Sequence, residues 1–395
     1  MDVKGREQGF SRFANRCNSG LLRLIAPHNS NLKTHSSRRL MVVFSSIVLL
    51  LIFVHDLAAQ SKKFYFKQNT FVDSQALPLA FAYKKWDVAY QPGGLTQGFV
   101  RTETGYTDGK QSMGIIYRFD VLAKYTSETI EFLHQVKNKT PLPLNKEYDI
   151  SLDIKHFRAG GVKFDYAFQL SQKISLVPSL SILRAHYLTE GILQGNATAI
   201  SEQDYDFDLN VDYYYTRDTL FNRRATPPTG WGFAFDLAFH ATPIQNLDIR
   251  LNIYDLLAYL YWRATPRTVA QADSSTKNYD LNGYLNFEPV LTGKESSESY
   301  TQRLTPRAIL QAEYRIGRIK FNPQMMATAY KNYYFLDTGF NISHKHWFIV
   351  GTEISTKTIK LGYKTNDFGI EILSNSIQPK NIYTLFVNFS FLTSF

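Results

Sequence analysis

Cysteine is almost absent from this chain: Cys17 is the only one among 395 residues. A disulfide needs two cysteines at a specific separation, so residues 60–395 can form none among themselves. The same residues offer no thiol for a lipid anchor. Whatever fold they adopt is therefore held together without covalent cross-links.

Long apolar runs are also missing beyond residue 59, where no stretch of about 18 consecutive apolar residues occurs. This excludes a helical membrane protein for that part of the chain. Catalytic signatures are missing too, because no Gly-x-Ser-x-Gly, His-Glu-x-x-His or phosphate loop appears. The sequence predicts a protein that is not an enzyme and carries no cofactor or metal. His344-Lys345-His346 could bind a metal, but no carboxylate is near in sequence, so a solvated turn is favoured.

The one apolar run lies near the start, where Arg38 and Arg39 precede Leu40 to Val54 and Ala58-Ala59 follows. Its fifteen residues would span about 22 Å as a helix, which is shorter than a hydrocarbon core of about 30 Å. We predict that residues 1–59 are a leader and signal peptide for general secretory export. A retained anchor and a start at Met41 remain alternatives. The net charge of +10 falls to +5 for residues 60–395, which gives no reason to expect a nucleic-acid partner.

What the chain does have is aromatic residues in alternation, with 25 tyrosines and 29 phenylalanines. Five apolar residues of its last segment share one parity, and the other parity is mostly polar: the five are Leu385, Val387, Phe389, Phe391 and Phe395. A strand places such residues on one face, and a transmembrane strand needs about 9–11 residues. A terminal strand that ends on Phe resembles the signal that outer-membrane barrels present to the barrel assembly machinery, so Phe389, Phe391 and Phe395 are the predicted assembly signal. An edge strand of a soluble sheet is the alternative.

Alternation recurs along the chain with no helical layer to cover it, which favours an all-β, transmembrane antiparallel β-barrel. An even strand number places both termini in the periplasm. Twelve or sixteen strands are alternatives; sixteen would require 203–216 and 279–288 to cross the membrane, and we interpret these instead as strands that project outward. The fourteen predicted strands are 97–106, 113–126, 148–157, 161–171, 174–189, 230–240, 246–262, 303–315, 318–330, 332–343, 346–355, 357–366, 367–376 and 381–395.

This arrangement puts the short connections near 172, 241–245, 316, 344 and 366 on the periplasmic side. The long inserts 190–229 and 264–302 fall outside, where long loops belong. Residues 127–138 have helical spacing, with Ser127 as a possible cap. We expect this helix on the periplasmic side or under the pore.

The predicted inward faces carry nearly balanced charge, whereas a strongly selective ion pore shows one sign in excess. One interpretation is that the charges pair across the lumen and fill it; the other is that some of them line a solute path. For that path we select Arg118, Asp120, Asp236, Arg250, Arg307 and Glu313. The other inward acids are Asp149, Asp153, Asp165, Asp248, Asp337, Glu353 and Glu371, and the other bases are Lys124, Lys155, Lys163, Lys320, Lys360 and Lys364. The acidic row Asp204, Asp206, Asp208 and Asp212 is interpreted as repelling charges on a solvent-facing edge rather than a calcium site.

Several segments resemble the superfamily that contains long-chain fatty-acid transporters and related conjugation-associated and uncharacterised outer-membrane barrels. They are 230–237 (GWGFAFDL), 247–255 (LDIRLNIYD) leading to Trp262, Leu304-Thr305-Pro306, and 91–95 (QPGGL), which stands where those proteins often have Asn-Pro-Ala-Gly-Leu. The resemblance implies an N-terminal plug at 60–96 inside an outer-membrane barrel of residues 97–395. It also implies the passage of hydrophobic solutes. The expected function is passive transport or binding of small, hydrophobic molecules, with outer-membrane lipid as surroundings; a structural barrel that assists secretion or surface assembly is the alternative.

Overall fold

The computed structural model describes residues 62–82, 90–221, 223–274, 277–279, 285–287, 291–343 and 345–394. The predicted signal peptide and the terminal Phe395 lie outside these ranges. The strands are β1 (Lys63–Ser74), β2 (Leu95–Thr107), β3 (Gln111–Tyr125), β4 (Glu147–Tyr166), β5 (Phe168–Ser171), β6 (Ile174–Ala199), β7 (Tyr205–Tyr215), β8 (Gly230–Ala241), β9 (Leu247–Asp273), β10 (Lys277–Tyr279), β11 (Leu285–Phe287), β12 (Leu291–Arg303), β13 (Arg307–Ile316), β14 (Ile319–Ala327), β15 (Asn332–Ser343), β16 (His346–Glu353), β17 (Thr358–Lys364), β18 (Phe368–Ser374) and β19 (Thr384–Ser394). The helices are η1 (Leu79–Ala82), α3 (Ser127–Asn138) and η2 (Pro379–Asn381).

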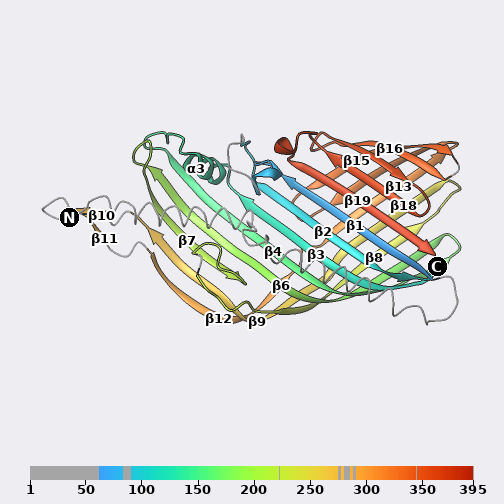
Figure 1. The fold of residues 1–395 in the computed structure, drawn as a ribbon, viewed down its shortest axis with the longest axis horizontal. Helices are drawn as coiled ribbons and strands as arrows, with labels where there is room; N and C mark the ends of the chain where they lie inside the picture. The colour runs from blue at the N-terminus through green and yellow to red at the C-terminus, as the bar shows by residue number, and fades with distance from the viewer. Residues whose placement is uncertain are drawn as a thin grey trace.

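These strands form a closed antiparallel barrel of fourteen strands, which confirms the predicted fold class. Around the barrel the order is β1, β2, β3, β4, β6, β8, β9 and β13 to β19, and β1 closes the sheet by pairing with β19 (Figure 1). None of the helices in the described ranges is long and apolar enough to cross a membrane.

The predicted number of strands is correct, but two of the predicted strands are not separate strands. The segments 148–157 and 161–171 belong mainly to one strand, β4, whose pairing with β3 runs unbroken from Gln111↔Tyr166 to Tyr125↔Leu152. Position 161, within this strand, requires glycine because a Cβ there would lie 2.0 Å from the carbonyl oxygen of Ile182. It allows a close strand–strand approach and does not mark a turn.

The second difference is the N-terminal strand, β1. It pairs with β19 from Lys63↔Ser394 to Asp73↔Thr384 and with β2 on its other side. The prediction of a plug is therefore wrong for residues 63–74, which are part of the barrel wall. One added strand and one merged strand cancel, so the total agrees with the prediction. Lys63 and Ser394 lie at the same end of the barrel, as an even number of strands requires.

The outer face of the barrel carries exposed apolar side chains. They include Ile115, Val162, Phe164, Leu180, Ile182, Leu257, Leu310, Phe321, Leu336, Phe340, Phe348, Val350, Leu361 and Ile372, which come from strands on all sides of the sheet. Patches of this extent are rare on monomeric proteins in water. A closed sheet leaves no backbone edge in hydrocarbon, so this barrel is built to cross a membrane.

Helix α3 lies at the end of the barrel that carries the long inserts, opposite the start of β1 and the end of β19 (Figure 1). The prediction of a periplasmic helix is wrong, because the added strand β1 reverses the direction of the three strands that follow it. Thr126, not Ser127, is the N-cap: its hydroxyl accepts a hydrogen bond from the Thr129 N–H at 3.2 Å. Ile130 and Leu133 are buried with Ala76, Leu77 and residues of β4, β6 and β7.

At this end β4, β6 and β9 continue beyond the other strands and form an extension with β7 and β12. β7 pairs with β6 (Thr189↔Tyr215 to Ala199↔Tyr205) and with β9 (Asp208↔Asp273 to Tyr214↔Arg267). The interpretation of 203–216 as an outward-projecting strand is confirmed. The predicted solvent-facing edge is wrong, because β7 has a neighbour on both sides. Its acids therefore meet partners: Asp212 binds Arg267 at 2.7 and 2.9 Å, and Asp208 accepts from Gln271 at 3.0 Å.

Asp218, in the connection that follows β7, is fully buried and organises that connection. It accepts hydrogen bonds from the Tyr213 hydroxyl at 2.6 Å, from the Phe221 N–H at 2.8 Å and from Arg223 Nε at 2.6 Å. Burial and the neighbouring Asp218 raise the pKa of Tyr213 well above its usual range, so Tyr213 stays a hydrogen-bond donor. The carboxylate thus ties the loop to the extension.

We predict that Asp218→Ala destabilises this loop by roughly 2 kcal/mol or more, since four donors, the Arg223 backbone N–H at 3.3 Å among them, lose their acceptor. Limited proteolysis of folded protein should then cut within 216–225 several times faster while the barrel stays intact. Glu202→Ala is the control, because Glu202 is exposed in the connection at the other end of β7. Equal cutting of the two variants would contradict this role.

Candidate functional site

The lumen is largely filled with side chains. One apolar cluster lies on the β3–β9 side and includes Leu183, Leu188, Leu260 and Trp262. A second cluster on the other side includes Phe71, Phe99, Ile309, Tyr333, Phe335 and Phe386. Polar and charged side chains, among them Arg101, Arg118 and Lys360, are buried beside these clusters.

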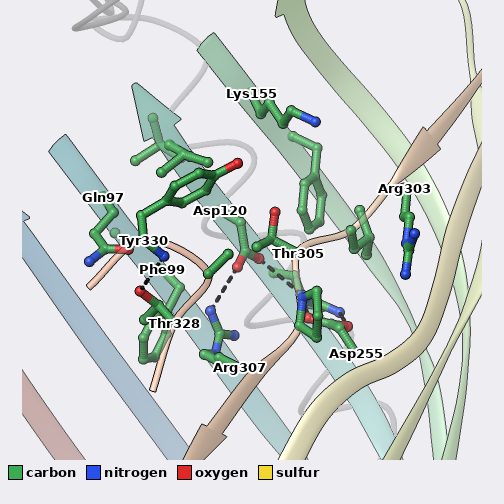
Figure 2. Close-up of a pocket in the computed structure, with 18 of the residues that line it drawn as sticks. Gln97, Phe99, Asp120, Lys155, Asp255, Arg303, Thr305, Arg307, Thr328 and Tyr330 are labelled. Carbon is green, nitrogen blue, oxygen red and sulfur yellow. Dashed lines mark hydrogen bonds and ion pairs between the residues drawn. The ribbon is translucent and has the colours of Figure 1, made fainter. Parts of the chain in front are cut away.

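The candidate site is a small cavity of about 70 Å³, partly open to solvent, near the end of the lumen that faces the long inserts. Its wall comes from β1 to β4 and β9, and its rim from two connections, 302–307 and 328–330 (Figure 2). The lining residues include Phe71, Gln97, Phe99, Arg118, Asp120, Lys155, Phe157, Asp255, Leu304, Thr305, Pro306, Arg307 and Tyr330.

Charged side chains form the floor of this cavity. Asp120 on β3 lies between two guanidinium groups: its Oδ2 is 3.2 Å from Arg118 and its Oδ1 is 3.1 Å from Arg307 (Figure 2). Arg307 begins β13, so the Asp120–Arg307 contact joins strands on opposite sides of the lumen. A carboxylate shared by two arginines leaves little free charge for a solute to meet.

The strongest contact of the floor is a bidentate ion pair between Arg118 and Asp255. The two N–O distances are 2.6 and 2.7 Å, and both side chains are 1 % exposed. β3 and β9 are separated by β4, β6 and β8 in the barrel, so this pair crosses the interior. Bidentate pairing fixes the guanidinium in one orientation.

A second cross-lumen pair adjoins the first. Arg101 on β2 binds Asp236 on β8 at 2.6 Å and Glu103 at 2.5 Å. The other oxygen of Asp236 accepts a hydrogen bond from the Asp255 backbone N–H at 2.8 Å. Asp236 and Asp255 are therefore held together, and the two arginines neutralise them from the opposite wall.

Of the six residues predicted for the solute path, the structure brings together Arg118, Asp120, Asp236 and Arg307. Arg250 and Glu313 lie nearer the periplasmic end and outside this network. There Arg250 contacts Asp248 at 3.4 Å, and Glu313 contacts Lys320 at 3.0 Å. Charges do pair across the lumen, as the first interpretation predicts; whether the same residues line a path remains a proposal.

Sequence reasoning missed Arg101, Glu103 and Asp255. Asp255 shares the parity of the outward-facing Leu251 and Ile253, but β9 contains a bulge between the pairs Phe235↔Leu257 and Leu237↔Ile253. Asp255 has a φ of 58° there, and the bulge turns its side chain into the lumen. The sequence signal that could have identified Asp255 is that it is the one acidic residue among apolar residues of the same parity. Arg101 and Glu103 alternate with weakly apolar neighbours, so the two faces of their strand differ little in polarity and the inward face could not be recognised.

The walls above the floor are apolar. Phe71, Phe99, Phe157 and Leu304 line the cavity, and the Arg307 guanidinium lies 3.7 Å from the centre of the Phe99 ring. Cation–π contact of this kind covers the charge with an aromatic face. The cavity is therefore amphipathic, with aromatic sides and a neutralised polar floor.

The described residues contain no group of three or more His, Cys, Asp or Glu side chains placed to hold a metal ion. His344 lies outside the described ranges, and the His346 ring contacts the Tyr363 hydroxyl at the start of β16.

The fold and the site together define a class: a membrane-spanning β-barrel of fourteen strands with a filled lumen and one amphipathic cavity near its outer end. No protein-family model matches the sequence, and no curated protein matches it.

Solved structures similar to this chain include a deltaS2S3 mutant of the monoaromatic hydrocarbon channel TodX, with a TM-score of 0.41 and 8 % identity over 85 % of this chain and 91 % of that one. A Pseudomonas aeruginosa FadL homologue has a TM-score of 0.33 and 8 % identity, covering 84 % and 87 %. The Escherichia coli outer membrane protease OmpT has a TM-score of 0.20 and 6 % identity, covering 86 % and 97 %.

Proposed function

We propose that this protein is an outer-membrane barrel that binds small hydrophobic molecules and lets them pass without an energy source. The cavity beside the Arg118–Asp120–Arg307 floor carries this proposal. Pockets for small molecules are mostly apolar, with a few polar groups that fix orientation, and this cavity has that composition. Residues 63–394 would reach the membrane through the assembly machinery, with Phe389 and Phe391 as part of the recognised end. Surrounding outer-membrane lipid would cover the apolar outer face.

In this proposal the floor residues act on the solute indirectly. Arg118, Asp120, Asp236 and Arg307 hold the cavity open and neutral, and the aromatic walls contact the solute. Passage toward the periplasm requires the cross-lumen pairs to rearrange, since they close the route below the cavity. Arg250 and Glu313 would lie further along the same route.

The test measures uptake of radiolabelled aromatic hydrocarbons and fatty acids in a deletion strain that carries plasmid-borne variants. Thr305→Trp fills the cavity from its rim, because Thr305 lies on a connection that lines it. Gln378→Trp adds the same side chain to an exposed turn elsewhere at the same end. We expect the wild-type protein and Gln378→Trp to restore uptake and Thr305→Trp to fail. Uptake that does not depend on the protein for any solute of the panel would contradict the proposal.

A second candidate function is a structural barrel that assists secretion or surface assembly. The filled lumen favours it, since two apolar clusters and several ion pairs occupy the interior. Co-purification of one stable protein partner in fixed stoichiometry, with no solute uptake, would support this candidate over the first.

A further inference from the structure

The outer face of the barrel carries a group of cations on β4, β6 and β9. Arg184 on β6 points away from the lumen, because its neighbours Leu183 and Ala185 are fully buried inside while Arg184 is exposed. Across the sheet, Arg184 pairs with Trp231 of β8, and Trp231 pairs with Tyr261 of β9. On the other side Arg184 pairs with Gly160 of β4. β4, β6, β8 and β9 thus carry one row of register partners on the outside.

This row marks the boundary of the apolar band. The next row toward the periplasm is Ile115, Val162, Ile182 and Phe233, all apolar. Arg184 is ten residues from the periplasmic start of β6 at Ile174, which is about 33 Å along a strand. A strand tilt of about 40° reduces this to about 25 Å, the height of the apolar band of such barrels. Trp231 and Tyr261 are the residue types that sit at the headgroup level of a bilayer.

The cations of this region lack carboxylate partners. Among the described residues, no ion pair is formed by Arg184, Arg158 or Arg263, whereas the lumen arginines Arg101 and Arg118 each bind carboxylates. The Arg184 guanidinium lies 5.5 Å from the Trp231 ring, and Arg158 lies about as close to the rings of Phe119 and Tyr187. Arg263 is exposed on β9, two residues beyond Tyr261 on the same face.

The surface beside Arg184 is also recessed. Gly160 has no side chain, and an added Cβ there would have only one atom nearby, at 3.8 Å. The recess is bordered by Tyr117, which pairs with Gly160, and by Arg184. An anionic group that enters this recess from the lipid side would meet the Arg184 guanidinium and the Tyr117 ring. Glu298, which pairs with Thr265 two residues from Arg263, is bound to Arg267 at 3.3 Å.

We propose that this surface binds the phosphate groups of a phosphorylated lipid in the outer leaflet, with Arg184 on β6 and Arg263 on β9 as the main ligands. Arginine matches phosphate oxygens with paired N–H donors. The aromatic side chains would contact the adjoining sugar or glycerol and the start of the acyl chains. The phosphate is supplied at this depth by the headgroup, since the row lies where hydrocarbon ends.

The test uses the full mature chain, purified in detergent, and native mass spectrometry to measure the affinity for bisphosphorylated lipid A and for the same lipid after enzymatic removal of both phosphates. We expect the phosphorylated lipid to bind about tenfold tighter, because contacts between exposed charges are individually weak. The variant Arg184→Gln/Arg263→Gln should lose this difference. Arg318→Gln, which alters an exposed turn at the periplasmic end, should keep it.

Heat-modifiable migration on a gel confirms that each variant is folded before its affinity is measured. The proposal is overturned if the two lipids bind equally, if the double variant keeps the tenfold preference, or if Arg318→Gln loses it as well. Full displacement of the lipid by millimolar inorganic phosphate would instead show a site for free anions, which also overturns it. The outcome is independent of solute uptake, because the surface lies outside the lumen.

Discussion

Replacing Arg118 with methionine should lower the free energy of unfolding by about 3–5 kcal/mol. Arg118 binds Asp255 at 2.6 and 2.7 Å and Asp120 at 3.2 Å, and it is 1 % exposed. Methionine preserves most of the volume but leaves the Asp255 carboxylate buried without its countercharge. The large loss comes from this unpaired charge rather than from the value of the ion pair itself.

The measurement is urea unfolding of protein reconstituted in lipid vesicles. Two comparisons isolate the cause. Lys124→Met removes an ion pair with Asp153 in which both side chains are over 30 % exposed, and it should cost less than about 1 kcal/mol. Arg118→Met/Asp255→Leu removes both charges and should be more stable than Arg118→Met alone. If Arg118→Met is no less stable than the wild-type protein, this account is contradicted, and the lumen contains enough water to solvate Asp255.

Replacing Trp262 with alanine should cost about 3–5 kcal/mol, whereas replacing Trp231 should cost far less. Trp262 is 1 % exposed and fills the lumen against Leu260 and Leu304, while Trp231 is 55 % exposed on the outer face. The two indoles belong to paired neighbouring strands, since Gly230 pairs with Trp262. A cavity inside the lumen stays empty of side chains, but a gap on the outside is filled by lipid.

Both variants can be compared by urea unfolding in the same vesicles, with folded migration on a gel as the control for assembly. The difference between them tests which face of β8 and β9 points inward. A larger loss for Trp231→Ala than for Trp262→Ala would mean that the two faces are assigned the wrong way round.

Alternation alone predicts the inward position of Arg118, Asp120 and Asp236, because each stands between apolar residues of the opposite parity. Period 2 is a local rule, and it fails where the backbone departs from it. Asp255 shows this: a bulge in β9 reverses its direction, so the partner of Arg118 could not be identified from parity. The pairing of Arg118 with Asp255 also joins residues 137 positions apart, and no local pattern encodes that contact.

The N-terminal strand could not be recognised for a related reason. Its inward face mixes Tyr65, Phe71 and Asp73 with Lys67 and Asn69, so the contrast between its faces is weak. Its position in the barrel is fixed by pairing with two strands: β2, which follows it in sequence, and β19, which is the last strand in the sequence. Because β1 is an additional strand, α3 lies at the end of the barrel opposite to the predicted one. The residue range of the helix, 127–138, was predicted correctly from its spacing.

The central claim is that β1 and β19 are neighbours and close the barrel. It is tested most directly by a disulfide between Thr70→Cys and Val387→Cys, which are register partners, in a chain whose one native cysteine, Cys17, is replaced by serine. A mismatched pair, Thr70→Cys with Phe391→Cys, is offset by four residues, or about 13 Å, beyond the reach of about 7 Å for a disulfide. We predict near-complete cross-linking of the matched pair in membranes, seen as a shifted band on a non-reducing denaturing gel, and none of the mismatched pair. No cross-link in the matched pair, or equal cross-linking in both pairs, would contradict a barrel wall in which β1 and β19 lie side by side.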